Sequence, residues 1–512
     1  MLIKKTLAFI LLAATISAAS GAEVAPATYC NPLPIPDYPV GRGVRDIAKG
    51  TPADDWGQWF LRHREQYREL ADPTVLWLDG KWYLYPSCDM AWVSADNGAT
   101  WQHHPLNIRD VGYAPTIVKH RGRFLLLASK SELYAADAPL GPFLPAGKIQ
   151  MKSVAGMPDF IDPMLFSDDD GRLFYYWGCS SSSGIWGVEL DAANPIHAVT
   201  TPAELIPFNP AAHPWEAIGE WNQDPTTGWM EGAWMLKRNG TYFLTYSAAG
   251  TENRTYAMGC YTAKSPLGPF TPQPRNPIFR TTEGLVTGTA HGCIVAGPED
   301  RLWVFYTLRA GVVHAFERRI GMDRVEMDGN GELFVPPATS CPQWLPGKIP
   351  GRQRATATGW LPINGNQATT GTTDAPNLAG RFAVDNELRT WWQPAEGDAQ
   401  PMLTSRFSAP ATIRAVRIIW RDVGLDSTRG VVPGPFRYRV ELETEKGKWT
   451  TILDRSGNAE DLLVDYREVT PTPGLRARLV ILGWPKGITP GVAEFTLFGN
   501  SVMKGLPDVD HH

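Results

Sequence analysis

Acidic and imidazole side chains open four short apolar segments that lie far apart in this chain. Asp72 stands in ADPTVLWL, Asp162 in IDPMLFSD, Glu231 in MEGAWMLK and His291 in AHGCIVAG. A protonated carboxyl can donate a proton to a leaving oxygen, and an ionised one can activate a water molecule. Grouping such side chains is costly, because like charges repel and burial disfavours ionisation, so a cluster of them indicates acid–base chemistry.

The segments also indicate the elements that position these side chains. Each opening, and a fifth, YAPTIVKH from Tyr113, is followed after a turn by an aromatic-rich segment. These second segments read GKWYLYPS, GRFLLLAS, GRLFYYWG, GTYFLTYS and DRLWVFYT. Repeats of several short strands at a long period predict an all-β, five-bladed β-propeller. Since its innermost strands line one channel, we expect Tyr113 and the four polar residues to converge there.

A second unit follows the repeats. The stretch WLPGKIPGRQRATATG, from Trp344, is rich in Pro and Gly and has no periodicity, which is typical of a linker. Beyond it, ATIRAVRIIW, FRYRVELET and ARLVILG alternate as half-buried antiparallel strands do. We therefore predict a propeller over residues 23–345, a linker over 346–355, a β-sandwich (jelly-roll) domain over 356–502 and a tail over 503–512.

The first residues have the pattern of a secretory leader. Lys4 and Lys5 precede an apolar run from Leu7 to Ile16, and small residues end at Ala22. The run is shorter than the ~20 apolar residues that span a bilayer. We expect residues 1–22 to be a cleaved signal peptide and the protein to be secreted or periplasmic, with no membrane partner.

The composition narrows the class of partner. There are 48 Lys and Arg against 53 Asp and Glu, a net charge of −5, which argues against a nucleic-acid partner held through its phosphates. The 20 Trp and 16 Tyr suit a neutral sugar ligand, although aromatic residues mostly fill cores. The six cysteines have no metal-ligand spacing, which favours buried thiols over a zinc site.

The series ADPT, YAP, IDPMLF, MEGAW and AHG, in this order, resembles glycoside hydrolase family 43 over roughly residues 28 to 345. The resemblance implies that Asp72 is the general base, Glu231 the general acid and Asp162 a modulator of the acid's pKa. It implies that His291 contacts substrate and stands beside a bound calcium or other ion, held through waters. Two further substrate-binding residues are implied: Arg309 in YTLRAG, and Tyr113 in place of the tryptophan of a WAP motif.

The chemistry agrees with this resemblance. Inverting hydrolysis of a glycosidic bond needs a protonated carboxyl and an ionised one about 6.5–9.5 Å apart. Side chains from different blades can face each other across a channel at such a distance. The negative charge of Asp162 would help to keep Glu231 protonated, and no cofactor is required for these steps.

Simpler interpretations stay open beside this one. Asp72 and Asp162 precede proline, and Asp-Pro often only starts a turn. Glu231 could form a surface salt bridge, and His291 could be a hydrogen-bonded core residue. SADNGATW from Ser94 has the Asp-box pattern of sialidases, so a sialidase-like hydrolase is one alternative. The other is a non-catalytic carbohydrate-binding propeller, because a displaced loop can abolish turnover.

The C-terminal unit resembles discoidin-like, galactose-binding-like sandwiches through AVDNELRTWW from Ala383 and AEFTLFG from Ala493. The resemblance implies a sugar site at the loops of one end and a structural calcium near Asp385 and Asn386, where a plain turn is an equal alternative. We interpret Trp391 and Trp392 as a core tryptophan beside a half-exposed one rather than a stacking platform.

The substrate depends on the loops around the channel. Family members act on arabinofuranosides, xylosides and galactofuranosides, so the resemblance implies a polysaccharide or oligosaccharide substrate. The aromatic segment from Asn31 to Leu70, which contains Trp56 and Trp59, is expected to wall off one side of the channel. A closed pocket would make the protein an exo-acting furanosidase (α-L-arabinofuranosidase or galactofuranosidase) or β-xylosidase.

Overall fold

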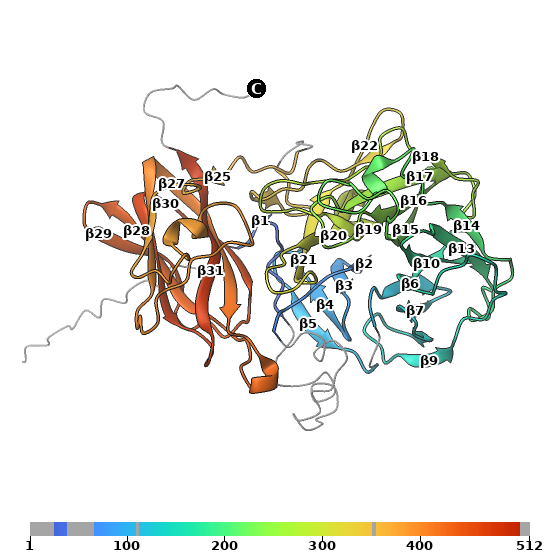
Figure 1. Cartoon of the computed structure of the whole chain (residues 1–512), viewed down its shortest axis with the longest axis horizontal. Coiled ribbons are helices and arrows are strands. Elements are labelled where there is room, and N and C mark those ends of the chain that lie inside the picture. The colour runs from blue at the N-terminus through green and yellow to red at the C-terminus, as the bar shows by residue number, and fades with distance from the viewer. Residues whose placement is uncertain (1–24, 38–65, 109–111, 351–354, 502–512) are drawn as a thin grey trace, which may run out of the picture.

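The computed structural model describes residues 25–37, 66–108, 112–350 and 355–501 (Figure 1). The predicted leader and tail, Trp56, Trp59 and part of the linker lie outside these residues. Strands dominate the described chain, and its helices are short 3-10 segments: η1 (Pro214–Glu216), η2 (Pro298–Asp300), η3 (Gly380–Ala383) and η4 (Ser427–Arg429). None of these helices has the length and apolar character needed to cross a bilayer. The predicted all-β class is confirmed.

Five antiparallel sheets, the blades, follow one another along the chain. Blade 1 contains β2 (Thr74–Leu78), β3 (Lys81–Tyr85), β4 (Met90–Ser94) and β5 (Gln102–Pro105). Blade 2 contains β6 (Thr116–His120), β7 (Arg123–Leu127), β8 (Leu133–Ala136) and β9 (Leu144–Gly147). Blade 3 contains β10 (Met164–Ser167), β11 (Leu173–Trp177), β13 (Ile185–Leu190) and β14 (Ala203–Ile206). Blade 4 contains β15 (Met230–Arg238), β16 (Thr241–Ala248), β17 (Ala257–Ala263) and β18 (Thr271–Pro272), joined by β12 (Cys179–Ser180). Blade 5 contains β19 (Ala290–Ala296), β20 (Leu302–Arg309) and β21 (Arg318–Arg324).

Local turn chemistry sets the hairpins inside the blades. Asp79-Gly80 and Asn239-Gly240 are two-residue loops in which both residues have positive φ, as tight hairpin turns require. In the predicted Asp box, Asp96 accepts hydrogen bonds from the backbone N–H of Thr100 at 2.9 Å and from the hydroxyl of Ser94 at 2.8 Å. This motif is therefore a structural turn between β4 and β5.

The N-terminal segment closes the propeller ring. The inner strands β2, β6, β10, β15 and β19 contact one another in a circle. Blade 5 has only three strands, and the backbone N–H of Leu33 donates to the carbonyl of Ile320 in β21 at 2.9 Å. The strand β1 (Thr28–Tyr29) pairs with β24 (Gln343–Trp344), and a small hairpin of β22 (Glu326–Met327) and β23 (Leu333–Phe334) follows blade 5. First and last parts of the propeller are thereby joined.

The C-terminal sandwich is one sheet folded over on itself. Its strands are β25 (Leu361–Pro362), β26 (Thr369–Gly371), β27 (Met402–Val423), β28 (Arg437–Glu445), β29 (Lys448–Arg455), β30 (Val464–Gly483) and β31 (Thr489–Ser501). The long strands β27 and β30 break register midway, so each serves both layers. One layer has the order β29-β28-β30-β27-β26 and the other β25-β31-β27-β30. Apolar side chains such as Leu403, Val440 and Phe495 fill the space between them.

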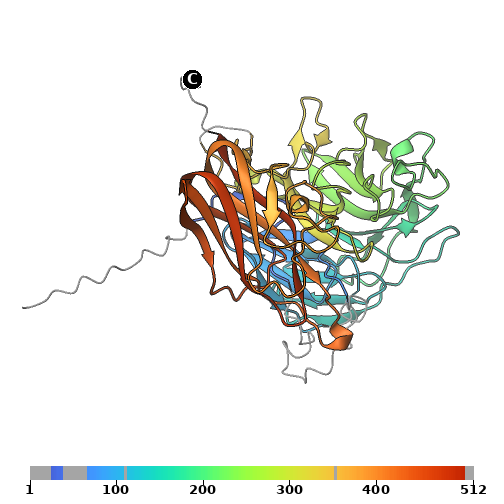
Figure 2. The same ribbon diagram turned by 60° about the vertical axis from the view of Figure 1, so that its left-hand side comes forward.

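The two domains share buried surface, and they lie side by side in both views (Figures 1 and 2). Leu388, Ile419 and Val464 of the sandwich belong to the same apolar cluster as residues of blades 4 and 5. Arg417 of β27 is 1% exposed and donates to the carbonyl oxygens of Asn31 and Ser340, both at 2.8 Å. We infer that the sandwich is packed rigidly against the propeller.

Candidate active site

The five blades present equivalent residues to the channel by the same backbone bend. Asp72, Ala114, Asp162, Gly232 and His291 each stand at the entrance of an inner strand with φ between 40° and 58°. A left-handed backbone is costly for residues other than glycine and marks functional positions. In blade 4 the bent residue is Gly232, and Glu231 directly precedes it. The structure therefore brings together the four polar residues that the sequence singled out.

A ring of hydroxyl groups holds these bends in place. In four blades, the hydroxyl oxygen of a Ser or Thr near the end of the second strand accepts a hydrogen bond from the backbone N–H of the bent residue in the next blade. The pairs are Ser87 with Ala114 (2.9 Å), Ser129 with Asp162 (3.0 Å), Ser247 with His291 (2.8 Å) and Thr307 with Asp72 (2.7 Å). In blade 3 the equivalent position is Gly178, whose N–H donates to the carbonyl of Ile161 as that of Ser129 does to Tyr113, so this blade adds no hydroxyl to the ring. Sequence reasoning missed this ring, although four of the five second segments end in Ser or Thr.

Asp72 is buried and surrounded by donors. Arg318 binds it with two nitrogens, Nη1 to Oδ1 at 2.9 Å and Nη2 to Oδ2 at 3.0 Å, and the Ser87 hydroxyl donates to Oδ2 at 2.7 Å. Burial alone would raise the pKa of Asp72, but Arg318 and His291 outweigh it and hold the pKa below its usual value. Asp72 is thus an ionised carboxylate at neutral pH.

The pKa of Glu231 is shifted in the opposite direction. Its Oε1 accepts from the Tyr256 hydroxyl and its Oε2 from the Cys179 thiol at 3.2 Å. Cys179 and Glu231 are direct partners where β12 pairs with β15. Burial raises the pKa of Glu231, and the charge of His291 and these two hydrogen bonds offset only part of this effect. A protonated Glu231 can donate a proton.

Asp162 and His291 complete the cluster. Nδ1 of His291 lies 3.4 Å from Oδ1 of Asp72 and 3.7 Å from Oδ2 of Asp162. Burial raises the pKa of Asp162 to about 7, with added repulsion from Glu231 and Asp72 against the attraction of His291. Burial would lower the pKa of His291, but the surrounding carboxylates raise it above its usual value. The charges of these groups are therefore interdependent.

Two predicted substrate-binding residues stand further out. Arg309 pairs with Glu220 at 2.6 Å and donates to the carbonyl of Glu252 at 2.9 Å, and these two partners lie outside the carboxylate cluster. Tyr113 makes an edge contact with Phe316 at 6.3 Å, and the Arg318 guanidinium lies 4.9 Å from that ring. Arg318 is the cation that reaches the cluster, and sequence reasoning missed it because nothing local links residue 318 to residue 72.

The cluster contains atoms that could hold a metal ion. Three possible ligand atoms, one each from Asp162, Glu231 and His291, lie within 4.8 Å of one another. Beneath them, the inner strands enclose a cavity of about 20 Å³ lined by residues such as Asp72 and Trp234, which is room for one water or ion. Two carboxylates and an imidazole fit a cation, which would compensate their negative charge.

The sandwich has a second carboxyl pair at the predicted calcium position. Burial raises the pKa of Asp385, and burial raises that of Glu494 to about 7 with a contribution from Asp385. The Thr390 hydroxyl donates to Asp385 at 2.8 Å, and the Asn386 N–H donates to Glu494 at 3.1 Å. The half-buried carboxyl of Asp385 and the buried one of Glu494 fit a cation, and Glu494 is the member that sequence reasoning did not name as a ligand.

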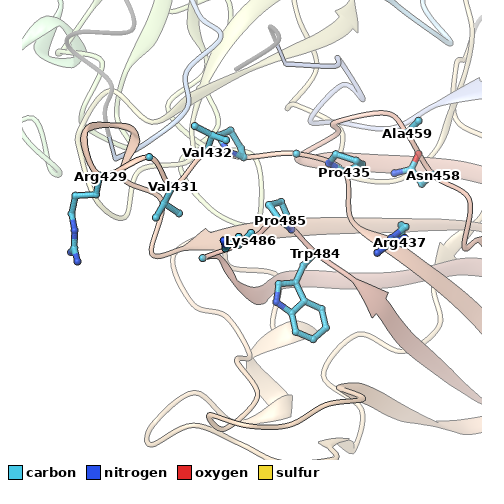
Figure 3. A pocket seen from close by; sticks show the side chains of 14 residues that line it. Arg429, Val431, Val432, Pro435, Arg437, Asn458, Ala459, Trp484, Pro485 and Lys486 are labelled. Atoms are coloured by element: carbon cyan, nitrogen blue, oxygen red, sulfur yellow. The ribbon is translucent and has the colours of Figure 1, made fainter. Parts of the chain in front are cut away.

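One hollow of the sandwich has no acidic group in its lining. Its volume is about 790 Å³, and its lining includes Arg437, Trp484 and Lys486 (Figure 3). Trp392 is fully buried and Trp391 is half-buried, as expected from the sequence. Of this hollow and the propeller channel, it is the channel that contains the carboxyls that hydrolysis requires.

Comparison with known proteins agrees with the geometry. Residues 89–333 match the family model "Glycosyl hydrolases family 43". The propeller belongs to this family. The chain is therefore a glycoside hydrolase, and the family 43 reaction inverts the anomeric carbon.

Family 43 proteins with assigned activities are distant relatives. "Beta-D-galactofuranosidase xynD" of Aspergillus niger is 25% identical over 303 residues, covering 52% of this chain and 81% of that protein. "Xylosidase/arabinosidase 43A" of Humicola insolens is 26% identical over 335 residues, covering 52% of this chain and 96% of that protein. A thermostable family-43 glycoside hydrolase of known crystal structure aligns with a TM-score of 0.45 at 23% identity, over 54% of this chain and 96% of that one.

Proposed function

We propose that this family 43 enzyme is secreted and removes single arabinofuranosyl, galactofuranosyl or xylosyl units from the ends of polysaccharide side chains. The relatives named as galactofuranosidase and xylosidase/arabinosidase support this range of sugars. Export and exo action rest on the leader pattern and on the aromatic segment before Asp72.

The observation that carries the proposal is that the pKa values of two buried carboxyls in one channel are shifted in opposite directions. Asp72 is held ionised by Arg318, so it is the general base that activates water. Burial raises the pKa of Glu231, which favours its protonated form, and we assign it as the general acid at the leaving oxygen. Asp162 modulates the pKa of that acid, and His291, beside which we place an ion, links the carboxylates.

Replacing the acid and the base separately tests these roles. Rates are compared on the nitrophenyl glycosides of α-L-arabinofuranose, β-D-galactofuranose and β-D-xylose and on disaccharides with the same terminal sugars. Glu231→Gln should lower kcat on the disaccharide by about 10²- to 10⁴-fold and less on the nitrophenyl glycoside, whose leaving group needs little protonation. Asp72→Asn should lower both rates strongly, because activation of water is needed for each.

The matched control is Glu445→Gln at the exposed end of β28, which should leave both rates unchanged. Equal losses on both substrates for Glu231→Gln would contradict its role as acid. Sugar binding without any turnover by the wild type would instead indicate a non-catalytic carbohydrate-binding propeller.

A further inference from the structure

A loop of the sandwich reaches the edge of the catalytic channel. In an antiparallel blade, the start of the first strand and the connection between the second and third strands lie at the same end. The connections 249–256 of blade 4 and 310–317 of blade 5 therefore surround the cluster of Asp72 and Glu231. A hollow of about 210 Å³ at these connections is lined by Glu252, Arg309 and His314, and also by Arg389 of the sandwich.

The sandwich loop is anchored so that its charged side chains are presented at this hollow. Leu388 is 5% exposed and packs in the apolar cluster of blades 4 and 5. Glu387 and Arg389 flank Leu388 and pair with each other: Nη2 of Arg389 donates to Oε2 of Glu387 at 2.9 Å. The side chain of Glu387 remains 40% exposed and that of Arg389 42% exposed. A buried anchor between two half-exposed charges fixes their position without covering them.

At this hollow, the charge of Arg389 in the sandwich interacts with that of Glu220 in the propeller. The hydrogen bond to Glu387 raises the pKa of Arg389, and Glu220 of the propeller adds to this shift. Glu220 in turn binds Arg309 at 2.6 Å and Arg254 at 3.0 Å. Glu220 lies in the connection that leads into β15, the strand of Glu231, so the hollow is on the side of the general acid.

The balance of charges indicates the chemistry of a ligand. Three guanidinium groups and three carboxylates gather here, from Arg254, Arg309, Arg389, Glu220, Glu252 and Glu387. Adjacent sugar hydroxyls donate to carboxylates and accept from guanidinium groups, whereas a uronic acid would leave these carboxylates opposed to its own charge. The set therefore suits a neutral sugar ring.

We propose that Arg389 and Glu387 of the sandwich, with Arg309 and Glu220 of the propeller, bind the neutral sugar unit on the leaving-group side of the bond that is cleaved. The sandwich thus completes the substrate-binding site of the propeller. This inference rests on the proposed function, because the general acid Glu231 defines the leaving-group side.

The test compares Arg389→Ala with wild type on two substrates that share a terminal sugar. A nitrophenyl glycoside has no second sugar, so its kcat/KM should change less than about twofold. On the disaccharide that matches the best nitrophenyl glycoside, kcat/KM should fall about tenfold through a higher KM, because a charged hydrogen bond to the second sugar is lost. Glu387→Gln should act in the same direction.

The controls separate this inference from the proposed function. Lys448→Ala removes the exposed partner of Glu445 at the far edge of the sandwich and should change neither substrate. Unchanged disaccharide kinetics in both Arg389→Ala and Glu387→Gln would overturn the inference while leaving the hydrolase intact. Equal losses on both substrates would also overturn it, since they would indicate a purely structural role. A wild type that cleaves neither substrate would contradict the proposed function itself.

Discussion

At the scale of single residues, the pKa of Glu231 reflects opposing neighbours. Glu231 and Asp162 repel each other when both are ionised, and this repulsion contributes to the raised pKa of Asp162. Because the repulsion acts on both carboxyls, Asp162→Asn should lower the apparent pKa of the alkaline limb of kcat/KM by about one unit. The pair titrates together, and the limb therefore belongs to both carboxyls. A pH–rate profile between pH 4 and 10 checks this, and an unmoved alkaline limb would contradict the role of Asp162.

The thiol of Cys179 should act in the opposite direction. Its hydrogen bond to Oε2 stabilises ionised Glu231 and lowers the pKa of this acid. Cys179→Ala should therefore raise the alkaline limb, whereas Cys179→Ser, which keeps a donor, should stay near wild type. The same pH–rate profiles decide, and a fall in the limb for Cys179→Ala would refute this role.

At the scale of elements, the carboxyl pair between the loop after η3 and β31 predicts calcium-dependent stability. Added Ca²⁺ should raise the unfolding temperature of the wild type, because a cation would relieve the repulsion between Asp385 and Glu494. Glu494→Gln should lose most of this increase. Differential scanning calorimetry with Ca²⁺ and with EDTA measures it, and Mg²⁺ is the control ion. An equal response in wild type and variant would exclude this pair as the binding site.

The same scale shows what sequence could and could not predict. Blades and turns were predictable, because alternating apolar residues and pairs such as Asn239-Gly240 act over a few residues. The cluster of Asp72, Asp162, Glu231 and His291 was predictable because the repeat itself implies convergence. Arg318 on Asp72 was not, since nothing local joins positions hundreds of residues apart. The fold class and the family assignment are confirmed, whereas the roles of the site residues stay predictions.

At the scale of the whole molecule, the shared core should make both domains unfold together. Arg417 is buried between them. Arg417→Met would leave the carbonyls of Asn31 and Ser340 with only the weak thiol donor of Cys30, at a cost of about 1–3 kcal/mol each. We expect calorimetry to show one transition in the wild type and a lower midpoint in this variant. The control is Arg414→Met on the same strand, whose partner is exposed Asn500. Two separate transitions in the wild type would contradict the shared core.

The N-terminal segment that closes the ring can reach its final position only late in folding. Thr28 lies in β1, pairs with Trp344 and is bonded through its N–H to Glu468, a residue 440 positions later. Contacts between such distant positions form slowly, and a growing chain cannot make them until nearly all of it has been synthesised. The contact of Leu33 with the edge of blade 5 needs only β21, whereas the anchor of Thr28 on Glu468 needs the second domain. We therefore expect the N-terminal segment of a nascent chain to reach its final position only after most of the sandwich has been synthesised.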